Sequence, residues 1–418
     1  MNFEELNVIS PLLKAILREG FDTPTKIQEE VIPFAIKGKD ILGSAQTGSG
    51  KTLAFALPIL QNLYNKRLEK GLKDGKIKRK IQALVIAPTR ELAIQIGEAF
   101  APYSTNTNMK HTVIYGGVNQ FHQVKAIEKG VDILIATPGR LEDLISQGII
   151  KLSYVEILTL DEADRMLDLG FLADIKKIIK RIPKQRQTFF FSATMPKTIK
   201  ALASSILHCP EEITVNTVSK PTNTIKQQVY HIKSSHRRQL LQQIVKNKKY
   251  DSILVFVKTM NDTEYVLEYV KVAGIKADSI HKKKTQNARQ KALKSLKNGE
   301  IKVLVATDIA SRGLDINDLS CVINFHIPSD SETYVHRIGR TARAGKKGVA
   351  ISFCIDKDKE NLSRIESLIG KKIEIIDDKS YLEEVIPKGR ILGYKDFEED
   401  GKKKYKSKSR KKRFYGKK

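Results

Sequence analysis

The sequence has few cysteines, and their spacing excludes several classes of protein. It contains three cysteines in 418 residues, Cys209, Cys321 and Cys354, and no two of them form a C-x-x-C pair. A disulfide-stapled secreted domain and a cysteine-based zinc site are therefore not expected. The pattern indicates free thiols in a reducing compartment.

Long apolar runs are also missing. No stretch approaches the roughly 18 apolar residues that a membrane-spanning helix needs. The acidic residues 1–6 have no apolar core of the kind that a secretion signal contains. The sequence therefore predicts a soluble, cytoplasmic protein.

Acidic residues are outnumbered by basic ones. The chain has 74 Lys and Arg against 47 Asp and Glu, a net charge of +27, which predicts a polyanionic partner. Residues 402–418 hold eleven basic residues and no acid, and subtracting them still leaves +16. We predict that residues 376–418 form a disordered basic extension, although a tail that only aids solubility would have the same composition.

Residues 44–52 read Ser-Ala-Gln-Thr-Gly-Ser-Gly-Lys-Thr, between an apolar run and a helical pattern. This order of strand, loop and helix is typical of a phosphate-binding loop. Gly48 and Gly50 allow backbone N–H groups to approach phosphate oxygens. Lys51 is placed to reach the β and γ phosphates, and the Thr52 hydroxyl to ligate Mg²⁺. Because Ala45 replaces the first glycine of the strict pattern, a surface loop remains the alternative at this point.

A second stretch, which is acidic, also indicates a nucleotide site. The apolar run at residues 155–160 ends in Asp161-Glu162-Ala163-Asp164. Acids just past a strand lie at the edge where α/β proteins bind ligands. Asp161 is placed to hold Mg²⁺, partly through water, and Glu162 to deprotonate a hydrolytic water. A solvated turn would show the same residues, but a phosphate loop upstream makes that interpretation the weaker one.

The fold class follows from the alternation of strand-like and helical patterns. This alternation runs through both halves of the chain and predicts mostly parallel sheets with helices on both faces, an α/β fold. Turn-rich residues 209–225 predict a linker between a first domain at 1–208 and a second domain at 226–375. Only the first domain carries a phosphate loop.

Short polar signatures follow several predicted strands. Those of the first half would place hydroxyls and arginines along one rim, able to grip a phosphodiester backbone without reading bases. In the second half, Arg340 and Arg343 are three residues apart and would project from one face of a helix. They could act as arginine fingers towards the phosphate loop, or lie on a basic helix that faces RNA.

These stretches, in this order, resemble the DEAD-box ATP-dependent RNA helicases of bacterial type. The resemblance extends from Phe3 to about Gly345, and Asp161–Asp164 spells the name of the family. It implies two tandem RecA-like domains with ATP and Mg²⁺ at their interface and RNA across both. Alanine is common in this family at the position of Ala45, so the departure in the phosphate loop no longer argues against it.

The resemblance also assigns roles to individual residues. It implies that Gln28 reads adenine with Phe3 packed nearby, and that Asp315 contacts the ribose. The phosphate-cradling residues are then Gln46, Thr47, Gly48, Ser49, Gly50, Lys51 and Thr52. The residues that grip RNA are Arg90, Gly117, Thr137, Arg140, Arg289 and Thr307. The residues that couple hydrolysis to unwinding are Ser192, Thr194, Asp164 and His336.

Some positions depart from the pattern of the family. Ala342 stands where glycine is usual, Lys26 where proline is frequent, and residues 281–284 replace a common glycine-bearing turn. None of these changes removes a chemical group that the mechanism needs.

The sequence therefore predicts an RNA-stimulated ATPase that separates short RNA duplexes or remodels RNA–protein complexes, with little base specificity. An ATP-controlled RNA clamp without productive unwinding is one alternative, and a DNA-directed motor of related architecture is another. A preference for RNA is implied by the resemblance, since 2′-hydroxyl contacts distinguish the two polymers.

Overall fold

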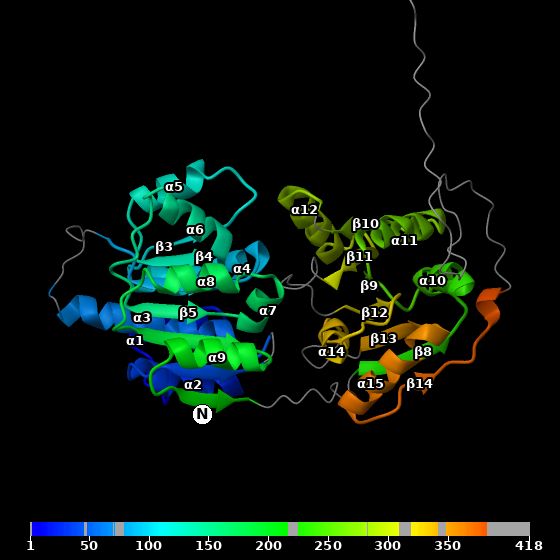
Figure 1. The fold of residues 1–418 in the computed structure, drawn as a ribbon, viewed down its shortest axis with the longest axis horizontal. Helices are drawn as coiled ribbons and strands as arrows, with labels where there is room; N and C mark the ends of the chain where they lie inside the picture. Colours follow the sequence, from blue (N-terminus) through cyan, green and yellow to red (C-terminus); the bar gives the residue numbers. More distant parts are fainter. Residues whose placement is uncertain are drawn as a thin grey trace, which may run out of the picture.

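The computed structural model describes residues 2–45, 48–69, 71, 79–215, 225–281, 283–308, 319–341 and 348–382. Two α/β halves follow one another along the chain (Figure 1). Each half contains a seven-stranded sheet, and every strand pairing that the structure describes is parallel. Among the described residues, no helix has both the length and the apolar character needed to cross a membrane.

The first half alternates strands and helices from residue 10 to residue 214. Its helices are α1 (Ser10–Arg18), α2 (Lys26–Ile36), α3 (Lys51–Glu69), α4 (Arg90–Asn106), α5 (Phe121–Glu128), α6 (Pro138–Ser146), α7 (Ala163–Asp168), α8 (Leu172–Ile179) and α9 (Lys197–Ile206). Its strands are β1 (Ile41–Ser44), β2 (Ala83–Ile86), β3 (His111–Ile114), β4 (Ile133–Ala136), β5 (Ile157–Leu160), β6 (Gln187–Ser192) and β7 (Glu211–Thr214). The order across the sheet is β3-β4-β2-β5-β6-β1-β7.

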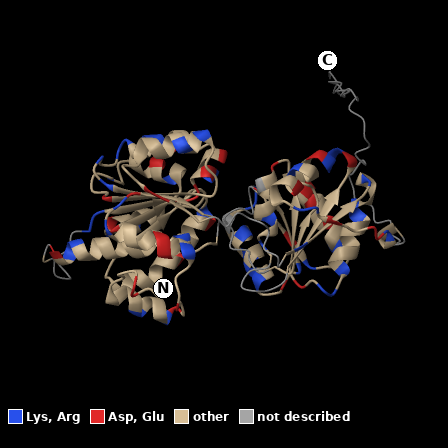
Figure 2. Ribbon diagram, turned by 90° about the horizontal axis from the view of Figure 1, so that it is seen from below, with Lys and Arg blue, Asp and Glu red and all other residues tan. Residues whose placement is uncertain are grey.

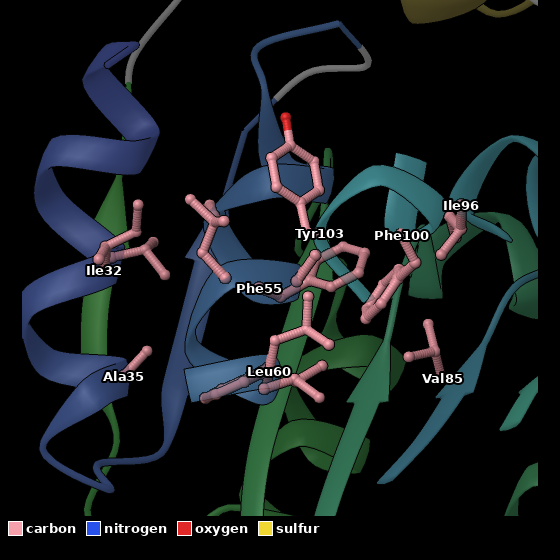
Figure 3. Packing of buried hydrophobic residues seen from close by; sticks show 14 of the residues in the cluster. Ile32, Ala35, Phe55, Leu60, Val85, Ile96, Phe100 and Tyr103 are labelled. Atoms are coloured by element: carbon pink, nitrogen blue, oxygen red, sulfur yellow. The ribbon is translucent and has the colours of Figure 1, made fainter. Parts of the chain in front are cut away.

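The core of the first half lies on both faces of this sheet. Neighbouring residues of β2 point to opposite faces, so Val85 packs in a cluster with α1 to α4, whereas Leu84 packs in another with α6 to α9. Figure 3 shows Phe55 of α3 beside Phe100 of α4, with 6.3 Å between the ring centroids. Each such fully buried side chain contributes roughly 1.5–3 kcal/mol of burial free energy.

The second half repeats the architecture. Its helices are α10 (Arg237–Lys246), α11 (Met260–Val272), α12 (Gln286–Lys297), α14 (Ser331–Ile338) and α15 (Lys359–Ile369), with short 3-10 turns η1 (Ser234–His236), η2 (Asp356–Asp358) and η3 (Ser380–Leu382). Its strands are β8 (Ile225–His231), β9 (Ile253–Val257), β10 (Ala277–Ile280), β11 (Val303–Thr307), β12 (Cys321–Asn324), β13 (Gly348–Cys354) and β14 (Glu374–Ile375). The order across the sheet is β10-β11-β9-β12-β13-β8-β14.

The predicted α/β class with mostly parallel sheets is confirmed, but the predicted boundaries need two corrections. The linker at 209–225 is too long, because Glu211–Thr214 form β7 and pair with β1 along the edge of the first sheet. The second domain extends beyond residue 375, because Tyr381 in η3 is buried against the core beside α10. The rest of the predicted extension, residues 383–418, lies outside the described residues.

Candidate functional site

The strand order of the first sheet brings the predicted nucleotide residues together. Strand β6 lies between β5 and β1, with Ser44 paired to Ser192 and Leu160 paired to Phe190. The phosphate loop follows β1, Asp161 follows β5, and Ser192 ends β6. Because the carboxyl ends of parallel strands meet at one edge of the sheet, these three segments form one site.

The phosphate loop has the backbone of an anion-binding turn. Gly48 and Gly50 have φ of 84° and 96°, a region that side chains other than glycine rarely adopt. Lys51 begins α3, is 5% exposed, and donates from Nζ to the Ala45 carbonyl at 2.7 Å. Among the described residues, Ser49 Oγ is buried and has no hydrogen-bond partner. A buried hydroxyl without a partner beside an ammonium group fits a phosphate oxygen.

Asp161 is the residue predicted to bind Mg²⁺ together with Thr52. Its side chain is buried at the end of β5, and burial raises the pKa of its carboxyl group to about 6, against the opposing effect of Lys51. Within the described part of the chain, no group of three or more His, Cys, Asp or Glu residues converges on a metal position. The donor set of Asp161 and Thr52 therefore fits Mg²⁺ only if phosphate and water complete the shell, which is how Mg²⁺ is usually held.

Glu162 has an unusual backbone conformation, and its carboxylate is held by an ion pair. Its φ of 52° and ψ of 54° place it in the left-handed region, which is uncommon for a residue with a side chain. Its N–H donates to Asp161 Oδ1 at 3.0 Å, and its carboxylate pairs with the Arg165 guanidinium at 2.9 Å. The Arg165 contact was not predicted from the sequence, because an i,i+3 pair on a short helix is common and carries no specific signal.

Asp164, Ser192 and Thr194 form one hydrogen-bonded network. The Asp164 N–H donates to Ser192 Oγ at 3.2 Å, and Ser192 Oγ donates to the Thr194 carbonyl at 2.7 Å. The Thr194 N–H and hydroxyl both donate to Asp164 Oδ2, at 2.8 and 3.0 Å. Hydrogen bonds therefore connect the acidic motif to the segment after β6.

Gln28 contacts the phosphate loop directly. Its Oε1 accepts from the Thr25 N–H at 2.9 Å, which caps α2, and its Nε2 donates to the Gly50 carbonyl at 3.0 Å. A Cβ at Gly50 would lie 2.6 Å from Thr25 Oγ1 and 2.7 Å from Gln28 Nε2, so only glycine fits there. Phe3 is 4% exposed within the core cluster of α1 to α4. Its predicted place near adenine stays a prediction.

The predicted RNA residues of the first half surround the loop after β3. The Arg90 guanidinium covers Gly117, where an added Cβ would lie 2.1 Å from Arg90 Nη2. Arg140 donates to the Val118 carbonyl at 2.9 Å and to Gln123 Oε1 at 3.2 Å. Thr137 is the N-cap residue of α6, directly before Pro138. Two guanidinium groups therefore contact this loop, Arg90 at Gly117 and Arg140 at Val118.

The predicted RNA residues of the second half lie at the facing edge. Arg289 of α12 forms an ion pair with Glu91 of α4 at 2.8 Å, a contact between the two halves. Burial lowers the pKa of the Arg289 guanidinium, with Glu91 acting in the opposite direction and Arg90 close by. Thr307 is the last residue of β11. The charge of Arg90 acts on the Arg289 guanidinium, so the structure brings these two residues close together.

Arg340 differs from its predicted place on a helix. Helix α14 ends at Ile338 with Gly339 as its C-cap, and Arg340 follows in a turn because Thr341 pairs with Leu319 in a parallel bridge. The position of Arg343 lies outside the described residues, as do Gln46, Thr47, Asp315 and Ala342.

Arg337 is an important residue that the sequence did not single out. Its Nε and Nη2 donate to the two Asp308 oxygens at 2.6 and 2.7 Å, and its Nη1 donates to Asn324 Oδ1 and the His326 carbonyl. Its guanidinium also lies 4.9 Å from the Phe256 ring centroid. The buried Arg337 side chain thus connects α14 to Asp308, the first residue after β11. The only signal for it was its place in the sequence beside His336 and three residues before Arg340.

A cavity of about 220 Å³ opens between the two halves. Glu162, Asp164 and Thr194 line it from the first half, while His336 and Arg340 line it from the second. The acidic motif, the coupling segment and one predicted arginine finger therefore face the same space. Figure 2 shows Lys and Arg spread over the helices of both halves, in keeping with the net charge of +27.

Comparison with known proteins identifies the family of the chain. Residues 25–202 match the family described as DEAD/DEAH box helicase, and residues 236–345 match the helicase conserved C-terminal domain. The chain is 39% identical over 374 residues to the DEAD-box ATP-dependent RNA helicase CshA of Bacillus subtilis, covering 90% of this chain and 74% of the relative. It is 40% identical over 400 residues to CshA of Streptococcus pneumoniae serotype 4, covering 96% and 74%.

Solved structures have the same two-part architecture. Saccharomyces cerevisiae Dbp5 bound to RNA and ADP BeF3 matches with a TM-score of 0.78 and 29% identity, over 91% of this chain and 97% of that one. A DEAD box protein from Methanococcus jannaschii matches with a TM-score of 0.51 and 39% identity, over 90% and 99%. With its two tandem RecA-like domains, the chain belongs to the family of DEAD-box ATP-dependent RNA helicases.

Proposed function

We propose that this chain hydrolyses ATP when RNA is bound and uses the cycle to open short RNA duplexes or to remodel RNA–protein complexes. The observation that carries the proposal is the cavity between the halves, where Glu162 and Thr194 face His336 and Arg340. A site whose reacting groups come from two domains is active only when both domains are in position. ATP hydrolysis is then linked to any ligand that holds the domains together.

The residues of the first half bind and position the nucleotide. Lys51 and the backbone N–H groups of the loop hold the phosphates, and Gln28 and Asp315 hold the adenine and the ribose. Bound Mg²⁺ supplies charge neutralisation at the phosphates. Thr52 and Asp161 orient it, the latter through water. Glu162 accepts the proton of the attacking water.

The residues of the second half complete the site. Arg340 and Arg343 neutralise the charge that develops on the transferred phosphoryl group, which arginine fingers do in related chemistry. His336 and the Asp164–Ser192–Thr194 network couple ATP hydrolysis to the unwinding of RNA. Arg90, Gly117, Thr137, Arg140, Arg289 and Thr307 hold the RNA backbone and account for low base specificity.

The test is the ATPase rate of the whole chain with RNA and with DNA of the same sequence, together with strand displacement from a short RNA duplex. We expect stimulation by RNA, weak stimulation by DNA, and ATP-dependent displacement. Lys51→Ala is the control and should abolish both activities while the protein stays folded. Equal stimulation by DNA would favour the DNA-directed motor, and RNA binding without displacement would favour the clamp.

A bacterial, cytoplasmic setting is part of this proposal. It is supported by three free cysteines, which suit a reducing compartment, and by the bacterial sources of the similar helicases. Fractionation of cells that express the chain would test it.

A further inference from the structure

An exposed phenylalanine lies next to the loop that two arginines hold. Phe121 is the first residue of α5, and 61% of its surface is exposed. Its N–H donates to Asn119 Oδ1 at 2.9 Å, which fixes the start of the helix. Figure 1 shows α5 on the outer end of the first half, after the loop that follows β3. Most of this side chain is therefore not packed in the hydrophobic core.

The position of Phe121 is fixed with respect to Arg140. Gln123, two residues further along α5, accepts from the Tyr115 N–H at 3.0 Å and donates to the Tyr115 carbonyl at 3.1 Å. The same Gln123 Oε1 accepts from Arg140 Nη1 at 3.2 Å, and Arg140 Nη2 reaches Val118 in the preceding loop. Phe121 thus starts the helix that carries Gln123, and Gln123 contacts the Arg140 guanidinium.

The surroundings of the ring are basic and aromatic. Lys125 Nζ lies 6.0 Å from the ring centroid, one helical turn along the same face. The His122 ring is 5.4 Å away in an edge-on arrangement, and its side chain is exposed. An exposed aromatic ring flanked by cations is the combination that proteins use to bind single-stranded nucleic acid, where bases stack on rings while cations meet phosphates.

We propose that Phe121 is a stacking platform for one unpaired nucleobase of single-stranded RNA, with Lys125 and Arg140 meeting the adjacent phosphates. This subsite rests on the proposed function, since it continues the backbone contacts of Arg90 and Arg140. It adds a contact with a base to a surface that otherwise holds only the backbone. Stacking accepts any base, so the subsite strengthens binding without specifying a sequence.

The test compares a short oligoadenylate with an abasic ribose-phosphate oligomer of the same length. For each polymer, the RNA concentration that gives half-maximal ATPase rate is measured with the wild-type chain and with Phe121→Ala. We expect Phe121→Ala to raise this concentration about 10-fold for oligoadenylate, as the loss of one stacked base would. The abasic polymer should show no change, and the RNA-saturated rate should stay the same. Phe121→Trp should restore the wild-type value.

Tyr154→Ala is the matched control. Tyr154 is 48% exposed and has Lys80 Nζ 3.5 Å from its ring centroid, but it precedes β5 and so lies at the opposite end of the sheet. This variant should leave both polymers unaffected. Because Phe121 is largely exposed, neither variant should alter thermal unfolding, which is measured alongside.

Each other outcome has a distinct meaning. If neither polymer stimulates the wild-type chain, the proposed function itself fails. If RNA stimulates the wild type and Phe121→Ala gives the same curves, the stacking platform is wrong. An equal loss for oligoadenylate and the abasic polymer would also overturn it, because Phe121 would then act on the loop that holds the backbone.

Discussion

At Glu162, backbone conformation and side-chain contacts both fix the position of the carboxylate. Its backbone is held in the left-handed region although it carries a side chain, and its carboxylate pairs with Arg165 at 2.9 Å. Strain of this kind costs of order 1–3 kcal/mol and persists only where surrounding contacts enforce it. The Asp161 contact to its N–H and the Asp164 network on the other side supply that enforcement.

The variant Glu162→Gln keeps the size of this side chain but removes the base. We expect ATP to bind as before and turnover to fall by about 10²-fold or more. The measurement is the steady-state ATPase rate at saturating RNA, together with nucleotide affinity. Arg165→Gln is the control, because it removes the ion pair and keeps the carboxylate. If both variants lose activity equally, the ion pair and not the base explains the effect.

Gln28 links the start of α2 to the phosphate loop through one amide group. The change Gln28→Glu keeps the acceptor for the Thr25 N–H and replaces the donor to the Gly50 carbonyl with a repelling oxygen. We expect ATP affinity to fall at least about 10-fold, since the partly buried Gly50 carbonyl loses its hydrogen bond from Gln28 and faces a like-charged oxygen instead. The thermal midpoint should change little. Unchanged ATP affinity would show that the Gln28–Gly50 contact does not support nucleotide binding.

At the scale of elements, His326 in the turn between β12 and α14 connects this turn to the end of β9 and to α14. His326 Nδ1 accepts from the Lys258 N–H at 3.2 Å, which connects the ends of β9 and β12. The His326 carbonyl accepts from Arg337. Burial, aided by the nearby charge of Arg237, lowers the pKa of His326 from its ordinary value of 6.5 to about 4. This imidazole is therefore neutral in the folded protein over most of the acidic range.

The lowered pKa of His326 predicts a loss of stability in acid. Between pH 6.5 and pH 4 the unfolded chain binds this proton more strongly than the folded chain does. The free energy of unfolding should thus be highest above pH 6.5 and fall towards pH 4, by up to about 3 kcal/mol from this group. Urea unfolding of the whole chain at several pH values measures it. In His326→Gln the decline over this range should be smaller by that amount, and an identical decline would contradict the assignment.

At the scale of the whole molecule, the chain has two domains, each with its own hydrophobic core. The first sheet ends at β7, so a fragment of residues 1–215 retains all of its strands, whereas one that stops at residue 208 would lose the edge strand. Arg340 reaches the cavity from the other half. Nucleotide binding and hydrolysis should therefore be separable by cutting the chain.

We expect the fragment 1–215 to bind ATP and to hydrolyse it far more slowly than the whole chain does with RNA. Arg340→Ala in the whole chain should lower RNA-stimulated turnover by about 10³-fold or more, the range found for arginine fingers, and leave nucleotide affinity intact. Arg364→Ala, on the exposed face of α15, is the control and should have no effect. A fragment as active as the whole chain would show that the second half supplies no catalytic group.

The sequence by itself determined the class of fold and the chemistry of the nucleotide site. Apolar strands alternating with helices specify parallel sheets, and the residues of the phosphate loop and the acidic motif follow directly after strands, where sheet geometry leaves little choice of position. Local order along the chain was enough for Gly48, Gly50, Lys51 and Asp161. The C-terminal limits of the two domains were less visible, because β7 and η3 are short and are defined by the partners they pack against.

Only the tertiary structure decided which distant groups meet. Gln28 reaches Gly50, Arg289 reaches Glu91, and Arg337 reaches Asp308 across 22, 198 and 29 residues of chain. Such contacts depend on strand order and on how helices pack over the sheet, and no local pattern encodes them. The exposure of Phe121 is of the same kind. In the sequence it is one apolar residue among many, and only the packing of α5 leaves its ring exposed, two residues before the Gln123 that contacts Arg140.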